Sequence, residues 1–279
     1  MSFIFPALAA LLQASSFTID KIAFRAKKIN YLNFTALGFA FLFLFNLLLW
    51  LALKPGFGAL TPASISLLLV STSILIATNL LFYRALKKEK LAEMQTLALV
   101  SSIPLVLLSF FAFPDEKNPL SLALALLASA LLVWSHWEKK HFHLAKKSYQ
   151  FLLWAIFVMP FAALLTKILL NSFHPITLQL YRDTLVALIL IPVLAKRAQR
   201  PALSTTALIA LSSLLSSIAG VLYLFGFKTL GVIQTVLIFS AEPFLVYLSA
   251  ILLLKEKIEK KKLVAFSALV ILIALSQAI

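Results

Sequence analysis

The chain has 279 residues, of which 62% are hydrophobic and 13% are charged, and its formal net charge at pH 7 is +15. A water-soluble domain has about 45 to 50% apolar and about 25% charged residues, so this composition excludes an ordinary soluble fold. The absence of cysteine excludes disulfides and thiolate metal sites. Because the basic residues lie in short runs between apolar stretches, we expect them to face anionic membrane lipids, and no nucleic acid partner is expected.

Ten apolar segments, each about 20 residues long, follow one another along the chain. They cover residues 2–20, 31–53, 62–83, 92–113, 119–137, 149–170, 175–195, 203–225, 231–254 and 261–279. Proline and charged residues mark the breaks, because proline cannot continue a helix and is tolerated only in its first turn. The runs are continuous rather than alternating, which favours helices over barrel strands. The sequence therefore predicts an all-α integral membrane protein with ten transmembrane helices.

The basic residues alternate between rich and poor connections. Twenty of the 25 Lys and Arg residues fall in the odd-numbered connections and four in the even-numbered ones, while Arg182 lies inside a segment. The positive-inside rule therefore places the odd-numbered connections in the cytoplasm and both termini outside. The first residues lack the basic start of a cleavable signal, so the first segment is expected to be retained as a helix.

An internal repeat divides the chain near its middle. Residues 95–104 (QTLALVSSIP) match residues 234–243 (QTVLIFSAEP) at an offset of 139 positions. Because each half contains an odd number of segments, the second half must enter the membrane in the opposite orientation. Inverted repeats of this kind are typical of secondary transporters, in which two halves move about a site near the bilayer midplane. We expect two inverted five-helix repeats, over residues 1–139 and 149–279.

Residues spread over the whole chain resemble the EamA-type family of the drug/metabolite transporter (DMT) superfamily. The resemblance rests on residues 83–87 (YRALK), Pro104, His174-Pro175 with Arg182, residues 223–228 (YLFGFK), Glu242-Pro243, residues 254–256 (LKE) and residues 260–273. It implies a ten-helix, basket-like carrier that moves small metabolites, often outward, by alternating access. The first half departs from the second, with Leu37 or Gly38 at the position of Arg182 and Ile103 at that of Glu242.

Three charged residues lie deep inside predicted segments, away from the segment ends. Arg182 and Asp183 lie seven and eight residues into the seventh segment, and Glu242 lies eleven residues into the ninth, counted from the same side. A charge near the bilayer centre costs about 2.5 to 3.5 kcal/mol, which makes each a candidate functional residue, and their similar depths are compatible with one cavity. In the functional interpretation, Arg182 binds a carboxylate or phosphate while Glu242 or Asp183 accepts a proton or a substrate ammonium group. In the alternative, Arg182 and one acid form a structural ion pair.

Further polar side chains are expected at membrane depth. Gln179 lies about one turn before the charged pair of the seventh segment and shares its helix face. Gln13, Asn46 and Asn79 are candidates to orient a substrate by hydrogen bonds, with interhelical packing as the alternative. Tyr223 is a candidate for the wall of the cavity, although an aromatic residue also commonly faces lipid.

Two prolines occupy matching positions of the repeat, Pro104 in the fourth segment and Pro243 in the ninth. Each removes a backbone hydrogen bond and frees a carbonyl, so each is a candidate hinge, with a passive kink as the alternative.

These patterns favour a secondary transporter that exports a small polar metabolite, such as an amino acid, across the cytoplasmic (inner) membrane by alternating access. Its energy would come from an ion gradient, such as protons, or from exchange against a counter-substrate, and no cofactor or metal is expected. The sequence has no GxxxxGK[ST] motif, which excludes primary active transport by this chain alone. The alternatives are a lipid flippase, a channel or a membrane-embedded lipid-modifying enzyme. The enzyme would need a nucleophile and a base at membrane depth, where no His or Cys is predicted.

Overall fold

The computed structural model describes residues 2–26, 29–87, 94, 100–136, 146–196, 201–254 and 260–277. Within these ranges the protein is all-helical and contains no strand. The helices are α1 (Ile4–Ala26), α2 (Tyr31–Leu53), α3 (Pro62–Leu86), α5 (Ser102–Ala112), the short 3-10 helix η1 (Pro114–Glu116), α6 (Pro119–His136), α7 (Lys146–Phe157), α8 (Met159–Leu169), α9 (Pro175–Lys196), α10 (Leu203–Thr229), α11 (Val232–Phe239), α12 (Glu242–Leu254) and α13 (Lys260–Ser276).

Five stretches of the described chain are helical, long and apolar enough to cross a membrane. They are Ile4–Phe24, Tyr31–Leu53, Pro62–Leu86, Leu203–Thr229 and Val232–Ser249, and the bent pair α7 and α8 gives a sixth if it is counted as one span. Many large apolar side chains lie exposed on these helices, for example Leu48, Leu51 and Leu69. Exposed apolar surface on this scale requires a hydrocarbon environment.

Local signals start the helices where the sequence predicts them. The Asn30 side chain accepts a hydrogen bond from the Leu32 amide and caps α2. Thr61 and Ser64 form a capping box at the start of α3, where Pro62 occupies the first turn. These side chains satisfy amide groups that have no partner within the helix.

Two predicted segments are interrupted. The segment predicted over residues 149–170 bends by 43° between α7 and α8, at Val158, and Pro160 lies in the first turn of α8. The segment predicted over residues 231–254 is divided by a turn at Ser240 and Ala241, so that α11 ends at Phe239 and α12 begins at Glu242. The break before α12 places the side chains of Ser240 and Glu242, which are 3% and 6% exposed, inside the helix bundle.

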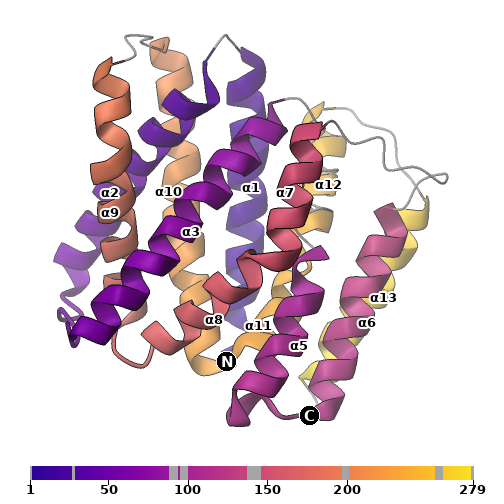
Figure 1. Cartoon of the computed structure of the whole chain (residues 1–279). Helices are drawn as coiled ribbons and strands as arrows, with labels where there is room; N and C mark the ends of the chain where they lie inside the picture. Colours follow the sequence, from indigo (N-terminus) through magenta and orange to yellow (C-terminus); the bar gives the residue numbers. More distant parts are fainter. Residues whose placement is uncertain are drawn as a thin grey trace.

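The helices of the two halves of the chain pack against each other. α1 packs most extensively on α10, α2 on α9, α6 on α13, and α3 on both α7 and α8. Figure 1 shows α1 and α10 near the centre of the bundle, with both chain termini at the same end. The largest cluster of buried apolar side chains joins α3, α5, α6, α8, α9, α10, α11 and α13.

Candidate functional site

A cavity of about 350 Å³ lies between α5, α8, α9, α10, α11 and the start of α12. Most of its wall is apolar, with side chains such as Leu105, Ala163 and Phe239. Arg182, Glu242 and Tyr223 contribute polar atoms from α9, α12 and α10 respectively. We call this space the first cavity.

Arg182 is buried beside the first cavity and is only 8% exposed. Its Nη1 donates a 3.3 Å hydrogen bond to Oγ1 of Thr166 on α8, and its Nε is buried without a hydrogen-bond partner among the described residues. Within the described part of the chain, no carboxylate oxygen lies within 4.0 Å of the guanidinium group. The guanidinium group therefore has donors left for a ligand.

Glu242 is the first residue of α12 and is 6% exposed. Its Oε1 is buried and has no hydrogen-bond partner in the described structure. The position in the first turn favours a negative charge, because the backbone amides at a helix start carry a partial positive charge. Arg182 and Glu242 thus line one cavity, as predicted from their depths, but they are not joined in the structural ion pair that was the alternative.

A second cavity of about 190 Å³ lies between α1, α2, α3, α9 and α10. Asp183 lines this cavity and not the first one, which corrects the expectation that all three charged residues share one cavity. Asp183 is fully buried, and its carboxylate accepts hydrogen bonds from Nε2 of Gln179, at 3.2 Å to each oxygen, and from Nδ2 of Asn46 at 2.6 Å.

Gln179 and Gly220 line both cavities and form the wall between them. A Cβ atom built on Gly220 would lie 3.5 Å from the amide carbon, nitrogen and oxygen of Gln179. The Gln179 amide group therefore lies flat against the glycine, while its Nε2 donates to Asp183 in the second cavity.

The remaining predicted amides are divided between the second cavity and helix packing. Gln13 and Asn79 line the second cavity, where Gln13 donates to Oγ of Ser216 at 3.3 Å and Asn79 donates to the Leu75 carbonyl at 2.9 Å. Asn46 lines neither cavity and contacts the site only through Asp183.

Sequence reasoning missed Asp20 of the second cavity, and it considered Tyr83 for a cavity wall but favoured a position facing lipid. The predicted first segment ended at Asp20, whereas α1 continues to Ala26 and places this carboxylate inside the bundle. Tyr83 on α3 donates a 2.9 Å hydrogen bond to Oδ2 of Asp20. The available signal was the match of Tyr83 with Tyr223 in the repeat, because both tyrosines line a cavity.

Pro104 and Pro243 lie in the first turns of α5 and α12 and not in the middle of continuous helices. A turn at Ser101 precedes α5, and the turn at Ser240 and Ala241 precedes α12. Residues 95–99, the first part of the repeat motif, lie outside the described residues.

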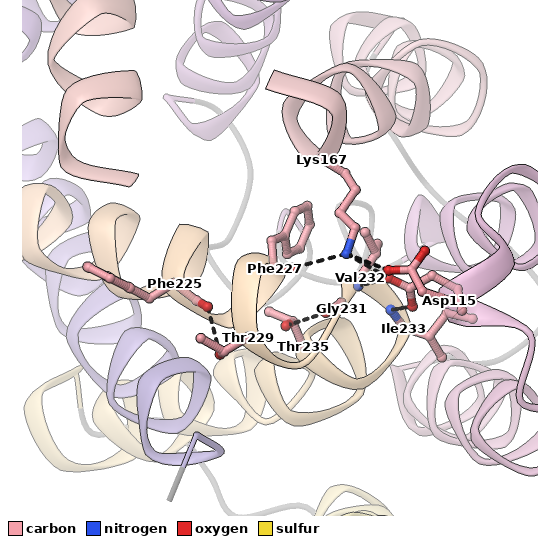
Figure 2. A network of polar contacts seen from close by, with 10 residues as sticks. Asp115, Lys167, Phe225, Phe227, Thr229, Gly231, Val232, Ile233 and Thr235 are labelled. Carbon is pink, nitrogen blue, oxygen red and sulfur yellow. Dashed lines mark hydrogen bonds and ion pairs between the residues drawn. The ribbon is translucent and has the colours of Figure 1, made fainter. Parts of the chain in front are cut away.

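A polar network adjoins the first cavity at the end of the bundle that contains both termini (Figure 2). Nζ of Lys167 lies 3.1 Å from Oδ2 of Asp115 and 3.6 Å from Oε1 of Glu116, and it donates to the Phe227 carbonyl at 3.3 Å. The buried Glu116 carboxylate also accepts hydrogen bonds from the first two amides of α11. The network thereby connects η1, α8, α10 and α11 directly behind Thr166 and Phe227 of the cavity wall.

Comparisons with known proteins give a family and a fold. The model of the EamA-like transporter family matches residues 146–276. No curated protein matches the chain. Among solved structures 26 chains match, and one of them, described only as the crystal structure of a protein, is similar with a TM-score of 0.73 and 18% identity over 97% of this chain and 96% of that chain. At this identity the likeness shows the fold alone.

The apolar helices and the family match together identify a multi-pass membrane protein. The match of residues 146–276 to the EamA model, whose family belongs to the drug/metabolite transporter superfamily, implies a transporter of the DMT type.

Proposed function

We propose that the protein is a secondary carrier that moves a small zwitterionic metabolite, such as an amino acid, across the cell membrane. The observation that carries the proposal is the presence of one guanidinium group and one carboxyl group, each without an ionic partner among the described residues, in a single largely apolar cavity. Arg182 would bind the substrate carboxylate by charge-assisted hydrogen bonds, and Glu242 would bind the ammonium group.

The dimensions and the wall of the first cavity support a small substrate. Its volume of about 350 Å³ lies at the lower end of the range for small-molecule sites, about 300 to 1,000 Å³. A zwitterion would satisfy both buried charged groups at once, whereas a neutral ligand would leave each without a partner, at a cost of about 1 to 3 kcal/mol per group.

The packing of the helices supports the inverted five-plus-five plan over residues 1–139 and 149–279. In this plan α1 corresponds to α7 and α8, α2 to α9, α3 to α10, and α6 to α13. A pseudo-two-fold axis then relates the contact of α1 with α10 to the contact of α3 with α7 and α8. The same axis exchanges α2 with α9, which are in contact, and α6 with α13, which are also in contact. All four contacts occur in the structure.

In this proposal the two repeats rock about the first cavity, which opens alternately to each side of the membrane. Pro104 and Pro243 act as hinges where α5 and α12 begin. The basic connections lie in the cytoplasm and both termini lie outside the inner membrane, and the direction of net transport is export. An ion gradient or exchange with a counter-substrate drives the cycle.

The test is counterflow of a panel of radiolabelled amino acids into proteoliposomes that contain the purified protein. For a transported amino acid, Arg182→Ala should lower the apparent affinity by about ten- to 100-fold, the equivalent of one or two charge-assisted hydrogen bonds. The amide derivative of that amino acid should bind both proteins equally weakly. Glu242→Gln should weaken binding of the amino acid but not binding of its deaminated analogue.

Two variants provide matched controls for these substitutions. Arg84→Ala removes an arginine of α3 that lines neither cavity, and Asp115→Asn converts an exposed acid into its amide. Both should retain counterflow. The proposal would be overturned if the wild-type protein counterflowed no zwitterion, or if Arg182→Ala and Arg84→Ala had the same effect. Turnover of a lipid substrate in these vesicles would instead favour the enzyme class.

A further inference from the structure

The second cavity is lined by oxygen atoms from five helices. Its polar wall consists of Asp20 and Gln13 of α1, Thr35 of α2, Tyr83 and Asn79 of α3, Asp183 and Gln179 of α9, and Ser212, Ser213 and Ser216 of α10. The titratable side chains among them are Asp20, Asp183 and Tyr83, and no described Lys, Arg or His lines this space. The cavity therefore contains two carboxyl groups and no described basic side chain, and the charge of Arg182, which lines the first cavity, acts on Asp183 from outside this space.

The two carboxyl groups are deeply buried. Asp20 is 2% exposed, and its Oδ1 has no hydrogen-bond partner among the described residues, while Oδ2 accepts from Tyr83. Asp183 accepts hydrogen bonds only from neutral amides. An acidic group at membrane depth costs about 2.5 to 3.5 kcal/mol unless a positive charge neutralises it, so a cavity with two such groups favours the entry of a cation.

We propose that the second cavity is the site of the coupling cation, a proton or Na⁺ that Asp20 and Asp183 bind between α1 and α9. The inference rests on the proposed carrier function and adds its energy source. Na⁺ would be coordinated by the carboxylate of one of the two acids and by amide and hydroxyl oxygen atoms near it, while the negative charge of the other acid in the same cavity would stabilise the ion. A proton would be held on one of the two carboxyl groups.

Gln179 connects this site to the substrate site. With Asp183 ionised, Nε2 of Gln179 donates to both carboxylate oxygens. A cation on Asp183 competes with that NH₂ group, and a protonated carboxyl group needs an acceptor in its place. Binding of Na⁺ or of a proton to Asp183 therefore rotates the Gln179 amide. Gln179 lies one turn before Arg182 on α9, and its amide forms part of the wall of the first cavity. Cation binding would thereby change the shape of the substrate site.

The first experiment measures cation binding without any substrate. The thermal unfolding midpoint of the detergent-purified protein is followed during titration with NaCl, balanced by choline chloride, and separately across a pH series in choline chloride. Wild-type protein should be stabilised either by Na⁺ or by the lower pH, which identifies the ion. The stabilisation should be lost in Asp20→Asn and in Asp183→Asn and retained in Asp115→Asn, which neutralises an exposed acid outside both cavities.

A neutral substitution tests the site if the Asn variants do not fold. Asn79→Leu removes an oxygen atom from the cavity wall but changes neither the charge nor, by much, the volume of the side chain. It should weaken the binding of Na⁺ by about tenfold. If the ion is a proton, infrared difference spectra of the wild-type protein between the two ends of the pH series should contain the band of a buried protonated carboxyl group. The proposal would be overturned if neither Na⁺ nor pH stabilised the wild-type protein, or if the Asn variants responded as the wild type does.

The coupling is tested separately from the carrier function. Coupling is measured as the ratio of gradient-driven accumulation to counterflow in the same vesicles, so that a change in substrate affinity at this shared wall cancels. For Gln179→Leu an imposed Na⁺ or proton gradient should no longer drive accumulation, and this ratio should fall well below the wild-type ratio. If wild-type counterflow were absent while the cation shift depended on Asp20 and Asp183, the proposed substrate would be wrong and the cation site would stand. A wild-type ratio of accumulation to counterflow in Gln179→Leu would overturn the coupling role.

Discussion

Arg182 and Asp183 are neighbours in the chain but line different cavities. Successive residues of an α-helix point about 100° apart, so one helix can supply a cation to one space and an anion to the next. α9 uses this geometry to keep opposite charges apart, with Gln179 one turn earlier between the two spaces. The two side chains interact electrostatically but form no direct ion pair, so each can contact a ligand in its own cavity.

Substitution of alanine for glycine is expected to have opposite effects at two positions of α10. At Gly226 a Cβ atom would lie 2.8 Å from Cγ2 and 3.0 Å from Oγ1 of Thr235, whereas at Gly220 the nearest atoms are 3.5 Å away. Gly226→Ala should therefore destabilise the protein by about 1 to 3 kcal/mol through overpacking of α10 against α11. Gly220→Ala should leave stability unchanged or slightly raised, since alanine favours a helix over glycine.

Thermal unfolding in detergent measures both glycine variants. The double variant Gly226→Ala with Thr235→Ala should recover much of the loss, because it removes both atoms that the new methyl group meets. A single Gly226→Ala protein as stable as the Gly220→Ala protein would show that the contact between α10 and α11 is looser than described.

At the scale of single residues, the sequence could give the depth of a side chain but not its rotation about the helix axis. The depth of each side chain was sufficient to predict that Arg182 and Glu242 line the same cavity, because both depths are counted from the same side of the membrane. It was not sufficient to separate Arg182 from Asp183, since rotation about α9 depends on how α2 and α10 pack against it. Asp20 was missed because the stability of its burial depends on Tyr83, a contact between positions 63 residues apart.

At the scale of helices, Glu116 acts as a cap supplied from another element. Its carboxylate accepts hydrogen bonds from the Val232 and Ile233 amides, and Gly231 precedes α11 with φ of +86°, a conformation that favours glycine. Glu116→Gln should lower the free energy of unfolding by about 0.5 to 2 kcal/mol through loss of the charged cap. Chemical unfolding in detergent measures this change.

Asp115 provides the matched control for the cap. It contacts the same Lys167, but its side chain is 64% exposed, and an exposed ion pair contributes at most about 1 kcal/mol. Asp115→Asn should therefore have a small effect on stability. Equal losses in the Asp115 and Glu116 variants would indicate that the charge of Lys167, and not the cap of α11, dominates this network.

The turn before α12 leads to a prediction about rate. Pro243 is the second residue of α12 and has no amide hydrogen to donate to the Phe239 carbonyl, which ends α11. Pro243→Ala restores a donor that can join the two helices, so we expect unchanged or higher thermal stability and slower counterflow. Pro62→Ala, at the start of α3 where no upstream helix can be joined, should leave the rate of counterflow unchanged.

Helix boundaries were predictable where local side chains set them. The predicted start points at residues 31 and 62 agree with α2 and α3, because Asn30 and Thr61 cap those helices from within the sequence. The bend at Val158 was not predicted. A local signal was nevertheless present, because Pro160 in the first turn of α8 has no amide hydrogen to donate to the Ile156 carbonyl and so interrupts the helix at this point.

At the scale of the whole molecule, the common position of the two termini predicts their accessibility. Both ends of the chain lie at one end of the bundle, and the end of α9 and the start of α10 lie at the other (Figure 1). The chain has no native cysteine, so single cysteines can be introduced without background. An impermeant maleimide should label Ser2→Cys and Gln277→Cys in intact cells, and Ala202→Cys only after permeabilisation.

The labelling also tests the inverted plan. An even number of crossings places both termini on one side, and the basic connections then lie in the cytoplasm. Labelling of Ser2→Cys and Gln277→Cys from opposite sides would contradict both the ten-helix plan and the antiparallel repeats. Labelling of all three positions from outside would contradict the assigned orientation of α10.

The thin partition made by Gln179 creates an opening for inhibitor design. The two chambers, of about 350 and 190 Å³, are separated by the side-chain amide of Gln179, which lies against Gly220. An elongated bitopic compound, with an acidic head for the guanidinium group and an amine tail for the aspartates, would need to displace only that side chain. Such a compound should inhibit transport, because it would occupy the proposed substrate site and the proposed cation site at the same time.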